Sequence, residues 1–227
     1  ELEFGPNGKY KTIEMELSDN QKVEIIGKID RVDIGKLNDK TYVRIIDYKS
    51  SVKNLDMNQV EAGLQIQLIT YLDAISKQED FIPSAVLYSS LIENLANKKR
   101  NLTNEEIEQE IRKKFRMDGI VLADVNVIKM MDTKIDNGQS DIIPVTLKQD
   151  GTISEGRSHT IKEEEFNNLQ EKVKDIIKDI SKEILQGNIN IKPYSYNGKT
   201  GCDYCEYKPI CMFNPNLKEN TYNYISK

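Results

Sequence analysis

Alternating apolar and polar positions predict three strands in the first quarter of the chain. Within residues 10–17, Ile13, Met15 and Leu17 alternate with polar side chains, which is typical of a half-exposed strand. Two longer apolar segments, 23–34 and 42–51, predict two more strands. The polar residues 36–40 separate them, so we expect the pair to form a β-hairpin.

A helical period then replaces the alternation. Residues 58–76 repeat apolar side chains at the spacing of one helix face, and Pro83 opens a strand predicted for 85–92. A capping box, Thr103-Asn-Glu-Glu106, begins a charged helix that runs to about residue 116 and is closed by Gly119.

The second half of the chain predicts one extended segment and one long helix. Residues 141–147 read as extended, with a turn at 149–151. A second capping box at 160–163 starts the long helix, and Gly187 ends it. Its apolar stripe consists of Phe166, Leu169, Val173, Ile176, Ile177, Ile180 and Ile184.

This order of elements predicts an α/β fold, a mixed β-sheet flanked by helices. Residues 1–191 form the predicted core domain. The tail, residues 192–227, is rich in Tyr, Asn and Pro and contains all three cysteines, so we treat it as a separate segment.

Composition narrows the possible classes of protein. The chain of 227 residues is 38% hydrophobic and 30% charged, which is globular and not disordered. It has no apolar run long enough to cross a membrane and no secretory signal, so we expect no membrane partner. An odd number of cysteines favours a reducing, cytoplasmic location. Its first residues read as the middle of a longer protein.

The net charge argues against a chain that coats nucleic acid along its length, but it allows local patches that bind phosphates. A net charge of -5 does not suit a basic arm that coats nucleic acid. Lys98-Lys-Arg100 and Arg112-Lys-Lys114 offer local positive charge for phosphates, although both also fit an ordinary solvated surface.

The predicted hairpin carries the chemistry. Residues two apart on a strand share a face, so Asp47 and Lys49 project side by side. If Asn38 and Asp39 are the two turn residues, Asp30 faces Asp47 across the hairpin, and Lys28 faces Lys49. Two carboxylates placed so closely repel each other unless a cation joins them.

A divalent cation resolves this repulsion. Mg²⁺, or Mn²⁺ in its place, accepts carboxylate oxygens together with water and phosphate, and the backbone carbonyl of Tyr48 is a possible third ligand. Lys49 would orient the attacking water and stabilise charge on a phosphate. The alternative interpretation of Asp47-Tyr-Lys49 is a solvated strand face.

These residues resemble a known family. Gly27-x-Ile-Asp-Arg-Val-Asp33 and Ile46-Asp-Tyr-Lys-Ser-Ser51 are similar to the RecB-family branch of the PD-(D/E)XK nucleases. Gln67-Leu-Ile-Thr-Tyr71 matches the family's Q-x-x-x-Y pattern, which implies that Gln67 and Tyr71 bind the substrate backbone or brace the metal carboxylates. Gln65 is a neighbouring candidate. The competing interpretation is that Gln67 lies on the helix surface and Tyr71 is an aromatic residue of the core.

The three cysteines of the tail form a second motif. Cys202, Cys205 and Cys211 follow the pattern C-x₂-C-x₅-C, which favours an iron–sulfur cluster over a zinc ribbon, although a fourth ligand is needed. His159 is expected to be an ordinary exposed residue and not that ligand.

The tail and several other stretches resemble the AddB subfamily of helicase–nuclease subunits. That resemblance implies a 4Fe–4S cluster whose fourth cysteine, like a helix-borne active-site histidine, lies before Glu1, so the cluster should be incomplete in this fragment. It also implies an ATP-dependent helicase region in the longer protein.

The expected function is therefore Mg²⁺-dependent exonuclease cleavage of single strands from unwound DNA ends, with an AddA-type helicase–nuclease subunit as partner. Such a complex resects double-strand breaks for recombinational repair. Two alternatives remain open, a stand-alone RecB-like exonuclease and a non-catalytic module that clamps DNA and docks the partner.

Overall fold

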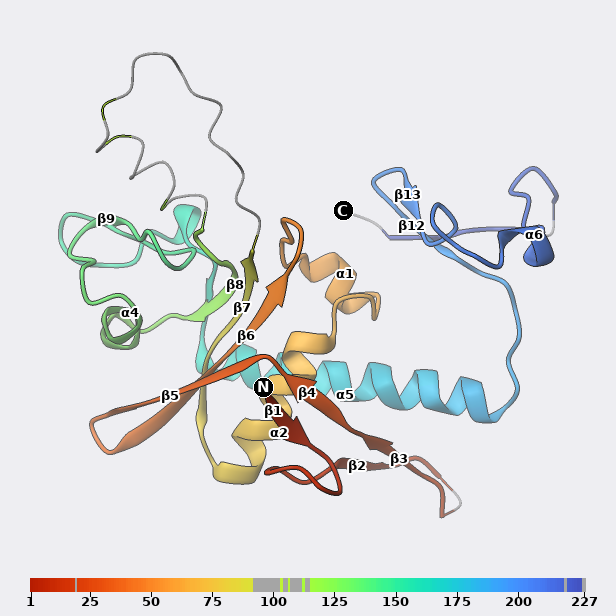
Figure 1. The fold of residues 1–227 in the computed structure, drawn as a ribbon, viewed down its shortest axis with the longest axis horizontal. Coiled ribbons are helices and arrows are strands. Elements are labelled where there is room, and N and C mark those ends of the chain that lie inside the picture. Colours follow the sequence, from red (N-terminus) through yellow and green to blue (C-terminus); the bar gives the residue numbers. More distant parts are fainter. Residues whose placement is uncertain are drawn as a thin grey trace.

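A five-stranded mixed sheet forms the centre of the molecule (Figure 1). The computed structural model describes residues 1–18, 20–91, 103, 106, 112, 115–218 and 220–225. The strand order is β11-β8-β7-β6-β5, with β6 and β7 parallel and β5 antiparallel to β6. The five strands are β5 (Arg31–Leu37), β6 (Lys40–Lys49), β7 (Ile82–Ser90), β8 (Asp118–Leu122) and β11 (Thr160–Ile161). The prediction of an α/β fold with a mixed sheet is confirmed.

The N-terminal strands are shorter than the sequence predicts. The segment expected as one strand over 23–34 breaks at Ile26 and at Asp30. It forms β3 (Lys22–Ile25), β4 (Gly27–Ile29) and β5, of which β3 pairs with β2 (Ile13–Glu16) and β4 with β1 (Leu2–Phe4). The breaks let one stretch of chain pair with three different partners, which the alternation pattern does not reveal.

The helix predicted over 58–76 is two helices, α1 (Met57–Glu61) and α2 (Gln67–Glu79). Asp56 caps α1 by accepting a hydrogen bond from the backbone N–H of Asn58. Gly63, with a φ of +78°, turns the chain between the two helices. The break lets α2 begin at Gln67, beside the end of β6.

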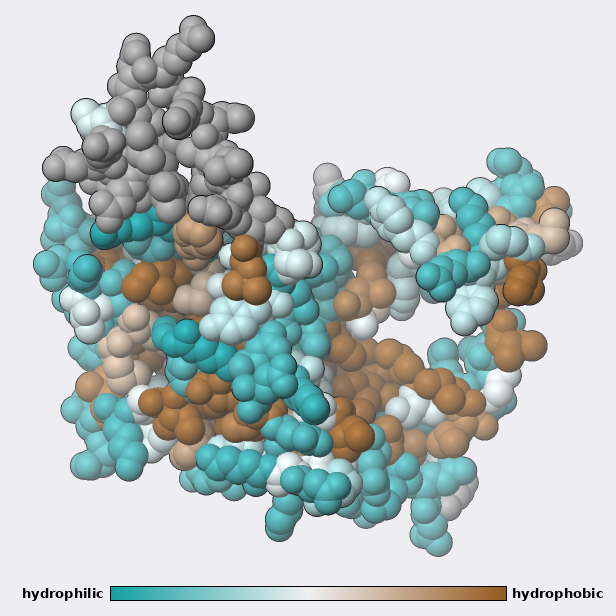
Figure 2. All heavy atoms as spheres, in the orientation of Figure 1, coloured by the Kyte–Doolittle hydropathy of each residue, from teal (hydrophilic) through white to brown (hydrophobic). Residues whose placement is uncertain are grey.

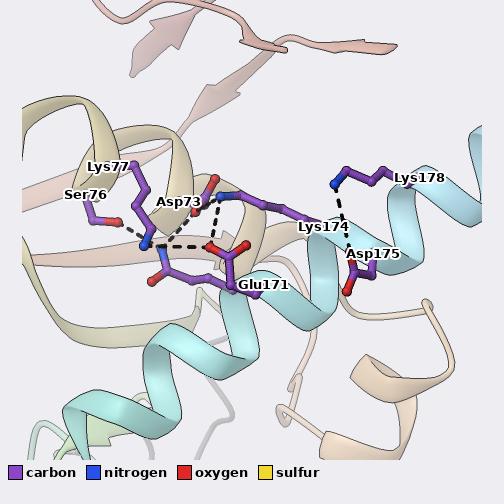
Figure 3. A network of polar contacts seen from close by, with 8 residues as sticks. Asp73, Ser76, Lys77, Glu171, Lys174, Asp175 and Lys178 are labelled. Atoms are coloured by element: carbon purple, nitrogen blue, oxygen red, sulfur yellow. Dashed lines mark hydrogen bonds and ion pairs between the residues drawn. The ribbon is translucent and has the colours of Figure 1, made fainter. Parts of the chain in front are cut away.

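Polar contacts fix α2 against the long helix α5 (Glu163–Leu185) (Figure 3). Lys174 reaches the buried carboxylate of Asp73 at 3.0 Å, and the Gln170 amide donates to Asp73 and to Ser76. Asp73 and Ser76 belong to α2, so these bonds set how α2 is rotated over the sheet.

Apolar side chains fill both faces of the sheet. Strand residues such as Ile45, Val86 and Ile120 pack with α2 and α5 on one face. Ile46, Leu87 and Val121 pack on the other face with α4 (Val125–Met131) and the loop that follows it. Alternate residues of one strand thus enter opposite cores, as expected for a sheet covered on both sides.

Several elements between residues 115 and 161 differ from the prediction. β8 and α4 were not predicted, because β8 follows closely on a charged segment and α4 is short. The extended segment expected at 141–147 is a loop that ends in β10 (Thr146–Leu147), paired with β9 (Gly138–Gln139), and η1 (Glu155–Arg157) follows. Gly119, which was predicted to close the charged helix, lies within β8 instead.

The helix predicted to begin at Thr103 falls mostly outside the described residues, as do Lys98, Lys99, Arg100, Lys113 and Lys114. Its capping box is present, because the Glu106 carboxylate accepts from the Thr103 N–H at 2.8 Å.

The long helix begins later than predicted and is buried over only half its length. Thr160 belongs to β11, and Lys162 is the N-cap, with the Glu165 carboxylate accepting from its N–H at 2.7 Å. Phe166 is fully buried, whereas Ile180 and Ile184 are 45% and 70% exposed. Figure 2 shows this hydrophobic surface along α5 beneath the tail. The helix ends before Gly187, as predicted.

The tail forms a small sheet of its own beyond α5 (Figure 1). Its elements are β12 (Tyr194–Tyr196), β13 (Lys199–Thr200), α6 (Lys208–Cys211) and β14 (Asn223–Tyr224). Across the described part of the chain, no helix is both long and apolar enough to pass through a membrane.

Candidate active site

The register of the hairpin brings Asp30 and Asp47 together. Asn38 and Asp39 both have positive φ, 49° and 59°, and form the two-residue turn. The ladder from Leu37↔Lys40 to Arg31↔Ile46 has the predicted register and ends one residue short of Asp30 and Asp47. The Asp30 carboxylate accepts from the backbone N–H of Tyr48 at 2.8 Å, which holds it beside the end of β6.

Lys28 does not continue this ladder. Its strand, β4, pairs with β1, where Lys28 is opposite Glu3. The chain bends at Asp30 between β4 and β5, so the predicted pairing of Lys28 with Lys49 is not part of the observed ladder.

Asp47 is the buried acid of the site, with 4% of its surface exposed. Its Oδ2 atom lies 2.6 Å from the Lys49 ammonium. The approach does not have hydrogen-bond geometry, so Oδ2 is a buried oxygen without a hydrogen-bond partner among the described residues. The Lys49 ammonium offsets the charge of this buried oxygen, but its hydrogen-bonding capacity stays unused, and that is costly unless a further ligand such as a metal ion satisfies it.

Three neighbouring side chains contact the Lys49 ammonium. Besides Asp47, its ammonium donates to Gln67 Oε1 at 3.2 Å and lies 5.5 Å from the centre of the Tyr88 ring. These partners come from β6, α2 and β7, so three elements meet at one cation.

Gln67 and Tyr71 lie on the same face of α2, as the four-residue spacing predicts. The Gln67 amide donates to the Tyr71 hydroxyl at 2.9 Å, so Gln67 links Tyr71 to Lys49. The Tyr71 ring packs edge-on against the fully buried Phe4. A Cβ at Gly27 would lie 2.8 Å from Phe4 and 3.2 Å from Tyr71, so a glycine is required there.

Gln65 is separated from this group. Its buried side chain accepts from the Asp56 N–H at 3.1 Å and donates to Gln59. These bonds brace the loop around α1, and Gln65 contacts neither Lys49 nor Tyr71 by hydrogen bonding.

Asp33, the second acid of the Gly27–Asp33 motif, is placed elsewhere. It binds Arg31 and Arg44, each at 2.8 Å. Burial raises the pKa of Asp33, but hydrogen bonds from the two arginines outweigh it and leave the pKa lowered. Asp33 therefore acts as a counter-ion for arginines and is not joined to Asp47.

Sequence analysis did not identify Tyr88 as a residue of the site. It pairs with Asp47 in the β6–β7 ladder and is 3% exposed. Burial, together with the charge of Asp47, raises the pKa of Tyr88 to about 12, so the phenol stays neutral. The sequence contains no signal for this placement, because it depends on which strand pairs with β6.

The acidic pair fits a divalent cation better than it fits solvent. Asp47 supplies a buried oxygen that lies beside the Lys49 ammonium but accepts no hydrogen bond, and Asp30 is held close by a single backbone hydrogen bond. Hard oxygen donors of this kind suit Mg²⁺ or Mn²⁺. Within the described ranges, no group of three or more His, Cys, Asp or Glu side chains is arranged to hold a metal, so further ligands would be water, substrate or backbone carbonyls such as that of Tyr48.

The cysteines lie together but do not complete a cluster site. Cys202, Cys205 and Cys211 are free thiols that line a common pocket of about 150 Å³. An iron–sulfur cluster normally takes four ligands, and the chain has only three cysteines. The His159 side chain is 62% exposed and lies 3.4 Å from Asp118, which agrees with its predicted place on the surface.

Comparisons with known proteins show which family the chain resembles. Residues 1–212 match the family model described as the PD-(D/E)XK nuclease superfamily. The B-type subunit of the ATP-dependent helicase/deoxyribonuclease of Acetivibrio thermocellus is 42% identical over 231 residues, covering 99% of this chain and 20% of that protein. The corresponding proteins of Clostridium kluyveri and Thermoanaerobacter pseudethanolicus are 42% and 40% identical. The chain thus spans about a fifth of the length of these relatives.

Proposed function

This chain belongs to the PD-(D/E)XK nuclease superfamily, and from that membership we propose that it is the metal-dependent nuclease domain of a helicase/deoxyribonuclease subunit of the B type. The observation that supports the proposal most directly is Asp47, whose buried oxygen lies beside Lys49 without a hydrogen-bond partner, while Asp30 binds the N–H of the next residue, Tyr48. The substrate would be single-stranded DNA from unwound duplex ends, and the full protein would resect double-strand breaks with a helicase partner of the AddA type.

Each residue of the site has a proposed role. Asp30 and Asp47 would hold Mg²⁺ or Mn²⁺, with the Tyr48 carbonyl as a further ligand. The ion, when bound, would activate water and neutralise phosphate charge. Lys49 donates a hydrogen bond to the phosphate oxygen that gains charge as water attacks phosphorus. Gln67 and Tyr71 orient the strand from α2.

The tail, residues 192–227, is proposed to supply Cys202, Cys205 and Cys211 to a 4Fe–4S cluster in the full-length protein. The fourth ligand would come from outside this chain, because no fourth cysteine is present. We assign the cluster no part in phosphodiester hydrolysis.

Asp47→Ala in the full-length protein tests the nuclease assignment. Strand-labelled DNA lets cleavage of each strand be followed separately when a partner subunit is present. We expect the variant to lose Mg²⁺-dependent cleavage of one strand by at least about 100-fold, because charge stabilisation at the phosphate is lost. Asp39→Ala, which alters a carboxylate at the turn of the same hairpin, serves as the control and should retain cleavage.

Retained cleavage in Asp47→Ala would remove the hairpin from the mechanism. If the domain is a non-catalytic clamp, the unaltered protein should bind DNA but should show no Mg²⁺ or Mn²⁺ binding that depends on Asp30 and Asp47.

A further inference from the structure

Lys49 is a flexible side chain that has to occupy one place. Its ammonium sits at the end of a four-carbon stem, and an amine on such a stem samples many rotamers unless neighbours restrict it. Asp47 Oδ2 and Gln67 Oε1 are its two polar partners, and the Tyr88 ring is the third neighbour, 5.5 Å away.

The two polar partners have other tasks under the proposed function, on which this inference rests. Asp47 would bind the cation and Gln67 the DNA strand, so both are expected to change their contacts when substrate arrives. The face of an aromatic ring attracts a cation without offering an oxygen that metal or phosphate competes for. The ring contact can therefore persist when the polar contacts change.

From this arrangement we propose that Tyr88 is a positioning residue, whose ring holds the Lys49 ammonium at the reacting phosphate during turnover. Tyr88 acts through Lys49 and is not assigned contact with the substrate.

The setting of Tyr88 suits this task. It lies on β7 in register with Asp47, so the two side chains project to the same face of the sheet. The residue is 3% exposed and packs in the same core as Val86 and Ile120. A ring enclosed in a packed core keeps its orientation, and it gives Lys49 a fixed surface.

The ring, and not the hydroxyl, makes the relevant contact. Within the described part of the chain, the Tyr88 hydroxyl has no hydrogen-bond partner, whereas the ring faces the ammonium. The proposal therefore requires that phenylalanine can replace tyrosine at this position, and that an aliphatic residue of similar size cannot.

Tyr88→Phe and Tyr88→Leu in the full-length protein test the proposal, with kcat and KM measured for Mg²⁺-dependent cleavage of labelled single-stranded DNA. We expect Tyr88→Phe to keep kcat within about twofold, and Tyr88→Leu to lower kcat about tenfold with KM within about twofold, since the loss concerns a cation–π contact of the ammonium. Phenylalanine would also preserve a merely structural role, so the kcat of Tyr88→Leu has to be compared with that of a variant that disturbs only the packing.

Tyr42→Leu is the matched control for packing. Tyr42 is also a buried tyrosine of this core, 7% exposed, but it lies near the start of β6. The Tyr42→Leu variant should lower the melting temperature as Tyr88→Leu does, but it should leave kcat unchanged.

Three results would overturn the proposal. They are wild-type kcat in Tyr88→Leu, an equal loss of kcat in Tyr88→Phe, and an equal loss of kcat in Tyr42→Leu. Failure of the nuclease assignment gives a different result, because Asp47→Ala would then keep its cleavage. An inactive Asp47→Ala together with a fully active Tyr88→Leu refutes the role of Tyr88 alone.

Discussion

Two aspartates show how surroundings set the acidity of a side chain in this molecule. Asp73 is buried under α5, and burial raises its pKa more than the nearby Lys174 and Lys77 lower it. Asp33 is also partly buried, but hydrogen bonds from Arg31 and Arg44 leave its pKa lowered. The same carboxyl group thus binds its proton more tightly at one site and less tightly at the other than in the unfolded chain.

Asp73→Asn should change how stability depends on pH. The folded pKa of Asp73 exceeds the ordinary value of 3.8, so its contribution is fully present below that value and is lost as pH rises through the folded pKa. Each pKa unit corresponds to about 1.4 kcal/mol. Without this carboxyl, the free energy of unfolding should decrease less steeply, or increase more steeply, as pH rises above 3.8. Urea unfolding of the 227-residue chain at several pH values measures this.

Asp33→Asn is the control of opposite sign. The lowered pKa of Asp33 gives stability that is present above 3.8 and is lost as pH falls through the folded value. This variant should therefore be less stable at pH 7 and lose less stability on acidification below about pH 4. Equal pH slopes for Asp73→Asn and the unaltered chain would contradict the argument for Asp73.

The hairpin is the element on which the site depends, and its turn is strained. Asn38 and Asp39 both adopt left-handed backbone conformations, which Asn tolerates better than most residues and which Gly adopts freely. Asp39→Gly creates Asn-Gly, a favoured pair for this type of turn. We expect it to stabilise the chain by about 0.5 kcal/mol, measured as a rise in melting temperature.

Asp39→Val provides the opposite test at the same position. A β-branched residue is strongly disfavoured at positive φ, so we expect a loss of about 1–2 kcal/mol. If both substitutions change the melting temperature in the same direction, the turn conformation does not govern the stability of the hairpin.

The hairpin also marks how far the sequence determines the site. A two-residue turn fixes the register, and the observed ladder ends one residue before Asp30 and Asp47, so local sequence was sufficient to bring both acids to the same end of the hairpin. The spacing of Gln67 and Tyr71 likewise placed both on one helix face. The place of Tyr88 in the site could not be predicted, because Tyr88 is brought next to Asp47 by the pairing of β6 with β7, two strands that are separated in the sequence by two helices.

The elements that were missed have a similar cause. β8 is a five-residue strand that pairs with β7 and β11, so its partners, and not its own pattern, define it. The apolar stripe of α5 was predicted from its spacing, but the spacing does not give its burial, which depends on where neighbouring elements end. Val173 is covered, whereas Ile184 extends past the core.

At the scale of the whole molecule, the tail meets the core near the candidate site. The Tyr196 hydroxyl donates to Asp56 at 2.7 Å, and Asn58 donates to the same hydroxyl at 3.4 Å. Asp56 caps α1, and its N–H binds Gln65, two residues before α2 begins. One side chain of the tail is therefore connected through short hydrogen bonds to the start of the helix that carries Gln67.

Tyr196→Phe should loosen this connection without disturbing the fold of the core. A hydrogen bond to a charged group contributes about 1.5 kcal/mol or more, and its loss raises the fraction of molecules with an open tail about tenfold. Trypsin cleavage in the tail after Lys199, which Thr200 follows, should accelerate by that factor when reclosing is faster than cleavage. Tyr194→Phe is the matched control, since this tyrosine lies on the same strand and, among the described residues, its hydroxyl has no hydrogen-bond partner. Equal cleavage rates for the two variants would show that the Tyr196 hydroxyl does not hold the tail against the core.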